Sequence, residues 1–157
     1  MKKLKAKNTE NFYAKNRKAF HDYEILEKFE AGVALLGDEV KSIKANQVSL
    51  KGSFVDVWKN EAFMNNVHVS PYKLSSNKDL NPTRKRKLIL HKREISKIEA
   101  AITQKGTTCI PLELYPKQGL IKVRIGICRG KKLYDKRETL KKRDQEIEIK
   151  RQLKRYR

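Results

Sequence analysis

Four side chains near the N-terminus are of types that carry out acid–base catalysis. His21 and Asp22 are adjacent, and Glu24 and Glu30 follow them. Because imidazole titrates near neutrality, a histidine beside carboxylates can act as a general acid or base, as in a nuclease. No nucleophile pair, metal-ligand motif or glycine-rich phosphate loop accompanies these residues. The sequence therefore favours a histidine in polar surface contacts. It predicts a protein that is not an enzyme, with no cofactor and no metal site.

The second chemistry that the sequence supports is binding of a polyanion. The chain carries a net charge of +20 and has a pI near 10.0. Basic residues are concentrated at 84–87, which read Arg-Lys-Arg-Lys, and in the C-terminal segment 129–157. This pattern indicates a nucleic acid or an anionic membrane as the partner. No long apolar run and no signal sequence occur, which favours RNA. The alternative is a solvated basic face that only keeps the protein soluble.

Aromatic residues near the basic segments could stack on bases, although each could equally be packed in the protein. These residues are Tyr23, Trp58, Tyr72 and Tyr134. The two cysteines, Cys109 and Cys128, lie in apolar segments that resemble strands. They are expected to be core thiols in a reducing cytoplasm, and a disulfide between them is disfavoured.

The elements that must position these residues follow from hydrophobic periodicity. Strands are expected at 23–29, 33–36, 54–59, 62–69, 110–115 and 121–128, and helices at 39–44 and 91–104. About six strands joined by regular turns predict a small antiparallel barrel. The segment 70–82 is expected to be a surface loop.

Several details of these elements are also predicted. Asp38 is expected to cap the first predicted helix, and Ala31-Gly32 to separate the first two strands. Phe63, Val67 and Val69 are expected to share one face of their strand, and Ile110, Leu112 and Leu114 to face inward together. Pro111 has no N–H to donate, so it belongs at a sheet edge or a bulge.

The chain as a whole is expected to comprise one modest domain with two extensions. Residues 1–15 are predicted to be a flexible basic N-terminus, and 16–128 the RNA-binding barrel. Residues 129–157 form a basic tail whose few apolar side chains cannot stabilise a core. The tail is therefore expected to be disordered in the free protein.

A set of motifs, in order along the chain, carries a resemblance to a known family. They are Asn16-Arg17-Lys18-Ala19, His21-Asp22-Tyr23, Glu30-Ala31-Gly32, Glu39-Val40-Lys41-Ser42-Ile43, Pro71-Tyr72, the run from Pro82 to His91, and the run from Gly130 to Arg137. Together they resemble the SsrA-binding protein family (small protein B), the bacterial protein partner of transfer-messenger RNA. The resemblance extends from about residue 15 to about residue 143.

The resemblance implies a mainly β fold: an oligonucleotide-binding-type antiparallel barrel with flanking short helices and a basic C-terminal tail. Members are not enzymes. They bind the tRNA-like domain of transfer-messenger RNA and deliver it to stalled ribosomes for trans-translation. The tail enters the empty mRNA channel and becomes helical there. The expected partners are this RNA and the ribosome's small-subunit decoding site, with elongation factor Tu and alanyl-tRNA synthetase as indirect partners. A cytoplasmic monomer without membrane contact is expected.

The resemblance also assigns roles to individual residues. Glu30, Ile89 and His91 match RNA-contacting positions, and His21 matches the position that faces the decoding site. Expected phosphate contacts are Arg84, Lys85, Arg86 and Lys87. The ribosome-binding tail motif comprises Gly130, Lys131, Lys132, Asp135, Lys136 and Arg137.

Other interpretations of these residues stay open. Glu30 could pair with Lys28, Ile89 could belong to the core, and His91 could simply begin a helix. A general RNA-binding or ribosome-associated protein, without a preference for a tRNA-like fold, is the alternative function. The family pattern is weakest at 77–81, at Asn46 and beyond Arg143, so Ile147, Ile149 and Leu153 receive no role.

Overall fold

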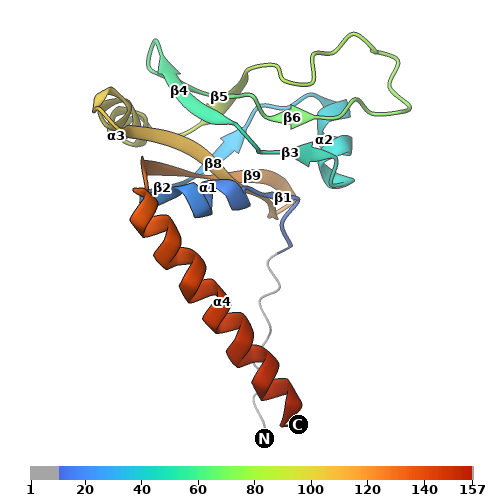
Figure 1. Ribbon diagram of the computed structural model, residues 1–157. Helices are drawn as coiled ribbons and strands as arrows, with labels where there is room; N and C mark the ends of the chain where they lie inside the picture. The colour runs from blue at the N-terminus through green and yellow to red at the C-terminus, as the bar shows by residue number, and fades with distance from the viewer. Residues whose placement is uncertain (1–10, 157) are drawn as a thin grey trace, which may run out of the picture.

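A closed antiparallel barrel forms the body of the protein, whose computed structural model describes residues 11–156 (Figure 1). A seven-stranded sheet has the order β1-β8-β4-β5-β7-β2-β9, and an additional pairing of β8 with β9 closes it. Its strands are β1 (Ala14–Lys15), β2 (Tyr23–Val33), β4 (Phe54–Trp58), β5 (Glu61–Asn65), β7 (Arg86–Ile89), β8 (Thr107–Lys117) and β9 (Leu120–Gly130). A small separate sheet pairs β3 (Val48–Ser49) with β6 (His68–Val69). The predicted mainly β, antiparallel fold is confirmed.

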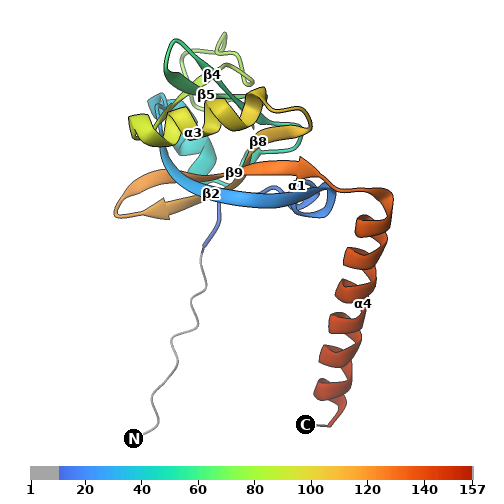
Figure 2. The ribbon, with the colours of Figure 1, turned by 90° about the vertical axis from the view of Figure 1, so that its left-hand side faces the viewer.

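Helices flank the barrel on three sides, and a fourth helix leaves it. They are α1 (Arg17–Asp22), α2 (Gly37–Lys44), α3 (Lys92–Thr103) and α4 (Leu133–Arg155). Ile95, Ile98 and Ile102 of α3 pack on the core, as their spacing predicts. Figures 1 and 2 show α4 projecting away from the barrel, on the side opposite β4 and β5. None of the helices within residues 11–156 combines the length and the apolar character needed to cross a membrane.

Strand β8 is buried on both faces, and a bulge within it reverses the face to which alternate side chains point. Its register with β9 shifts between Pro111 and Glu113, as expected for a proline within a ladder. Ile110 and Leu112 pack in a cluster with Ala19 of α1, whereas Leu114 lies in the main core. The prediction that these three β8 side chains share one face is therefore wrong, because the bulge reverses the alternation.

Strand β2 runs unbroken through the predicted bend at Ala31-Gly32, and the second predicted strand at 33–36 does not form. Gly32 pairs with Lys122 of β9 on one side and with Ile89 of β7 on the other. A β-carbon at Gly32 would approach the Ile89 β-carbon to 3.2 Å. The glycine therefore permits close strand contact instead of a turn.

Two other local predictions are corrected. Ala62 and Met64 are the buried side chains of β5, so Phe63 points away from the core. Asp38 lies inside α2, and the cap comes from Glu39, whose Oε2 accepts from the Leu36 N–H at 3.0 Å. Asn46 ends this helix in the left-handed conformation, with φ of 58°, as its type predicts.

A buried charge cluster joins α2 to β7. Arg86 is 0% exposed and Glu39 is 2% exposed. The Arg86 guanidinium donates to Glu39 Oε1 at 2.8 and 3.0 Å and also to the carbonyls of Val67, Pro82 and Arg84. Arg84 adds bonds of 2.7 and 2.6 Å to the same carboxylate. Burial alone would raise the pKa of Glu39, but hydrogen bonds from Arg84, the Leu36 N–H and Arg86 lower it below its ordinary value.

We expect Glu39→Gln to destabilise the protein by about 3 kcal/mol, because it leaves a buried guanidinium without its counter-charge. Urea denaturation measures the change. The matched control is Glu61→Gln, which breaks the exposed 2.7 Å pair with Lys87 and should cost less than about 1 kcal/mol. Equal losses in the two variants would show that the buried cluster does not stabilise the fold.

Candidate nucleic-acid interface

On the outer face of β2, β8 and β9, neighbouring side chains hold the Glu30 carboxylate in place. Glu30 lies opposite Arg124 in the β2–β9 ladder and is exposed. Lys117 donates to its two carboxylate oxygens at 2.9 and 3.1 Å, and the Tyr115 hydroxyl donates to Oε2. Glu30 therefore pairs across the sheet with Lys117, and not with the neighbouring Lys28.

These contacts fix the protonation states of the site. The Tyr115 hydroxyl, followed by Lys117, holds the pKa of Glu30 below its ordinary value. Burial, together with the Glu30 carboxylate, raises the pKa of Tyr115 to about 12. At neutral pH the carboxylate is thus charged and the phenol is a neutral donor. A carboxylate has more acceptor positions than these two donors fill, so it can also accept from base amines or 2′-hydroxyls.

The polar contacts continue beyond Tyr115 to the N-terminal strand. The Arg124 guanidinium lies 5.0 Å from the Tyr115 ring centre and donates to Glu113 at 2.6 Å. Glu113 in turn lies 3.6 Å from the Lys15 ammonium of β1. Tyr115, Lys117 and Arg124 were not predicted as site residues, because only the closed barrel brings them to Glu30.

Ile89 and His91 lie on the outer surface, at the end of β7. The Ile89 side chain is 64% exposed, so the alternative that places it in the core is wrong. It sits beside Gly32, two residues along β2 from Glu30. His91 is exposed and is the N-cap residue of α3, with its N–H donating to Glu94 at 3.0 Å. Its position at the start of a helix leaves the imidazole accessible to a ligand.

The four basic residues at 84–87 point alternately toward the core and toward solvent, as side chains of a strand do. Arg86 points inward and has no accessible surface. The prediction that it contacts phosphate is therefore corrected, and Arg86 is a structural residue. Arg84 is largely engaged by Glu39. Lys85 and Lys87 point outward, where they pair with Asp56 at 3.6 Å and Glu61 at 2.7 Å. The period of two through Leu88 was the sequence signal that could have shown Arg86 to be inward.

His21 lies at the junction of α1 with α4. Its Nδ1 is 2.8 Å from Asp22 Oδ1, and this hydrogen bond, more than the nearby lysines, lowers the pKa of Asp22. A groove of about 600 Å³ separates the two helices. It is lined by Lys15, Arg17, Phe20, His21, Thr139, Leu140 and Arg143. Within residues 11–156, no three His, Cys, Asp or Glu side chains are grouped to hold a metal ion.

Lys131 fastens the start of the tail to α1. Its N–H donates to the Asp22 carbonyl at 2.9 Å, and its ammonium to the Phe20 carbonyl at 3.3 Å and the Thr139 hydroxyl at 3.1 Å. Lys136 approaches Asp22 to 3.8 Å. The family resemblance placed Lys131 in a ribosome-binding motif, but the sequence gave no sign of this attachment to α1.

The other predicted tail residues occupy varied positions. Gly130 ends β9, Lys132 is the N-cap residue of α4, Asp135 lies in its first turn and Arg137 is exposed. Ile147, Ile149 and Leu153 are also exposed, at 42, 57 and 65%. Helix α4 therefore presents a largely polar, basic surface with a few unburied apolar side chains.

We expect Tyr115→Phe to raise the pKa of Glu30 toward its ordinary value. The hydrogen bond from the Tyr115 hydroxyl stabilises the charged carboxylate, and the substitution removes it. A pH titration followed by NMR of the Glu30 carboxyl carbon measures this shift. Tyr72→Phe is the control, since Tyr72 lies in the 70–82 loop beside Lys41. An unchanged Glu30 pKa in Tyr115→Phe would mean that the tyrosine does not hold this carboxylate.

Comparison with known proteins gives consistent matches over almost the whole chain. The SmpB protein family model matches residues 13–155. An SsrA-binding protein of Lactiplantibacillus plantarum is 49% identical over 99% of this chain and 100% of its own. One from Caldicellulosiruptor bescii is 48% identical over 98% of this chain and 99% of its own.

A solved structure agrees with the sequence matches. It is described as "tmRNA-SmpB: a journey to the center of the bacterial ribosome", and its matching chain is 46% identical with a TM-score of 0.65. The match covers 76% of this chain and 84% of that one. The family resemblance carried by the sequence motifs is therefore confirmed, and this chain belongs to the SmpB protein family.

Proposed function

We propose that this protein binds the tRNA-like domain of transfer-messenger RNA and delivers it to stalled ribosomes for trans-translation. The observation that carries the proposal is Glu30, an exposed carboxylate held charged by Tyr115 and Lys117 on a protein of net charge +20. In such a positive field an acid opposes non-specific attraction to phosphates. Its place at the surface is explained by hydrogen bonds to particular bases or sugars.

The proposed RNA surface is the outer face around the β2–β7 seam, with Glu30, Ile89 and His91 at its centre. Lys85 and Lys87 add phosphate contacts beside it. Arg86 is left out, because the ion pair with Glu39 buries it. The protein is proposed to act by binding RNA, and a nuclease that uses His21, Asp22 and Glu30 is the disfavoured alternative.

The tail and α1 are proposed to contact the ribosome. His21 faces the small-subunit decoding site, and the segment from Gly130 to Arg137 positions α4 toward the empty mRNA channel. A helix with few packed apolar side chains gains little from tertiary contacts, so we expect it to be unstable alone and stabilised by surrounding RNA. Elongation factor Tu and alanyl-tRNA synthetase would meet the complex through the RNA. The protein is also proposed to be cytoplasmic and monomeric.

We expect the tRNA-like domain to keep a large affinity advantage over single-stranded RNA of equal length at high salt. Non-specific binding falls by a slope of about −0.7 per neutralised phosphate on single strands, whereas hydrogen-bond recognition is less salt-sensitive. Glu30→Arg should remove most of this advantage, although it adds positive charge. Glu99→Arg, an equal charge change on the exposed surface of α3, is the control and should not.

The opposite results are equally informative. If both RNAs weaken in parallel with salt, the protein is a general RNA-binding protein without preference for the tRNA-like fold. If Glu30→Arg binds the tRNA-like domain more tightly than the wild type, Glu30 makes no specific contact with it.

We expect removal of residues 131–157 to leave binding of the tRNA-like domain largely intact at high salt but to abolish tagging on stalled ribosomes. The truncation keeps β9 whole, and the described contacts of α4 with the body are few. RNA titration and an in vitro tagging assay measure the two activities. Loss of specific RNA affinity in the truncated protein would contradict the proposed division between barrel and tail.

A further inference from the structure

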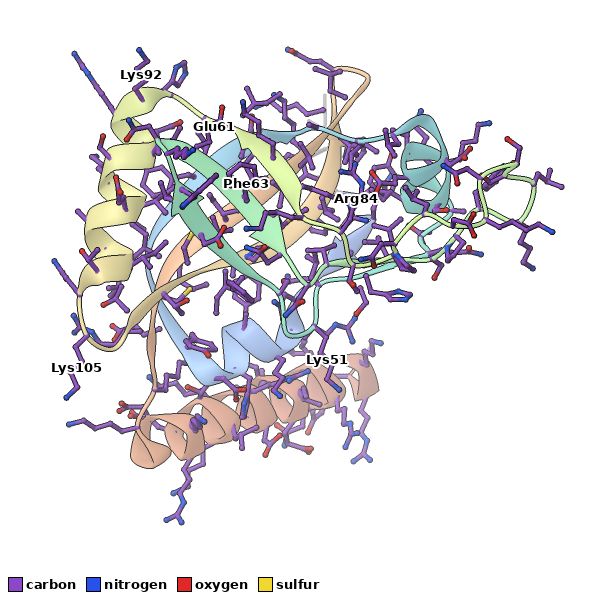
Figure 3. The ribbon with its side chains drawn as sticks, turned by 90° about the horizontal axis from the view of Figure 1, so that it is seen from above. Lys51, Glu61, Phe63, Arg84, Lys92 and Lys105 are labelled. Carbon is purple, nitrogen blue, oxygen red and sulfur yellow. The ribbon has the colours of Figure 1, made fainter. Side chains whose placement is uncertain are left out.

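The outer face of β4, β5 and β7 carries exposed aromatic rings that no helix covers in the described part of the chain. Figure 3 looks down on this face, where Glu61 and Phe63 lie on β5 and α3 flanks the strands. Trp58 is 63% exposed and Phe54 41%, and Phe63 is half-buried. Large exposed rings clustered on one sheet face are unusual unless they meet a partner.

Lysine side chains accompany these rings. The Lys59 ammonium lies 4.4 Å from the Trp58 ring centre, and the Lys85 ammonium lies 5.4 Å from that of Phe63. Lys87 stands opposite Phe63 in the β5–β7 ladder. Aromatic rings flanked by cations are the combination that binds single-stranded nucleic acid, in which bases stack on the rings and phosphates meet the cations.

The face is continuous with the proposed RNA surface. Trp58 stands opposite Glu61, and the pairing of Ala62 with Leu88 places Glu61 beside Ile89. Ile89 in turn stands opposite Gly32. A single row of side chains across neighbouring strands therefore connects Trp58 to Ile89 and the β2–β7 seam.

From this continuity we infer that the outer face of β4 and β5 is a stacking surface for unpaired nucleotides of the bound RNA, with Trp58 as its principal ring. The inference rests on the proposed function and adds a second part to its RNA surface. Base-paired regions keep their bases stacked internally, whereas loop nucleotides can be turned outward onto aromatic side chains. The occupant is therefore a loop of the folded RNA.

The acidic residues on this face do not oppose the inference. Asp56 pairs with Lys85 at 3.6 Å and Glu61 with Lys87 at 2.7 Å, and all four side chains are between 39 and 53% exposed. Exposed pairs of this kind contribute little to stability. Phosphates can therefore compete for the two lysines, while the acids limit attraction of RNA that offers no base to stack.

Trp58 provides its own test, because it is the single tryptophan of the chain. We expect saturation with the tRNA-like domain to quench the tryptophan fluorescence of the full-length protein, with a midpoint equal to that of binding. An equal length of fully base-paired RNA should leave the fluorescence nearly unchanged. Trp58→Ala should weaken binding of the tRNA-like domain by about 5- to 150-fold, which corresponds to loss of one base–aromatic stack.

Two further variants separate stacking from general effects. Trp58→Phe keeps a ring and should retain most of the affinity. Leu74→Ala removes another highly exposed apolar side chain, 83% exposed in the 70–82 loop, and should bind as the wild type does.

The inference and the proposed function fail in different ways. Unchanged fluorescence and wild-type affinity of Trp58→Ala, with binding lost in Glu30→Arg, would overturn the stacking surface and leave the proposed function standing. If the wild-type protein shows no affinity advantage for the tRNA-like domain over single-stranded RNA at high salt, the proposed function fails, whatever the Trp58 variants show.

Discussion

The ion pair between Glu39 and Arg86 is the constraint on which the rest of the proposed RNA surface depends. It joins α2 to the strand at which the 70–82 loop re-enters the barrel, and the same guanidinium holds the Val67 and Pro82 carbonyls. A slip of one residue in β7 would bring Lys85 and Lys87 inward and turn Arg86 outward. Because a buried guanidinium without its carboxylate is costly, the ion pair opposes that slip. The outward position of Ile89 follows from it.

Local patterns predicted the parts of the fold that local forces determine. The spacing of Ile95, Ile98 and Ile102 predicted α3, and the missing N–H of Pro111 predicted the bulge in β8. The period of two through Leu88 indicated an inward Arg86, but it was misplaced because the acid that makes a buried arginine stable lies 47 residues away in sequence. A run of four basic residues looks like a phosphate-binding segment unless the distant acid that neutralises one of them is known. The periodicity of one strand cannot identify an acidic partner on a distant helix.

The candidate site was predictable by a different route. Glu30, Ile89 and His91 came from the family motifs, and composition alone would have favoured a plain surface ion pair for Glu30. The partners that give Glu30 its properties lie 85 and 87 residues away, on β8. They reach it because β9 lies between β2 and β8 and pairs with both. Closure of the barrel therefore creates a site that no single segment contains.

On the proposed RNA surface, charge and specificity are assigned to different residues. Lysines attract any RNA and lose their effect as salt rises, whereas a fixed carboxylate and an exposed ring respond to base edges and base faces. Glu30 and Trp58 stand at the two ends of one continuous strand face, with Ile89 between them. An RNA that satisfies both must present hydrogen-bond donors and an unstacked base at a fixed separation. A folded RNA can meet that geometric requirement without further cost, while a flexible strand must lose conformational entropy to do so.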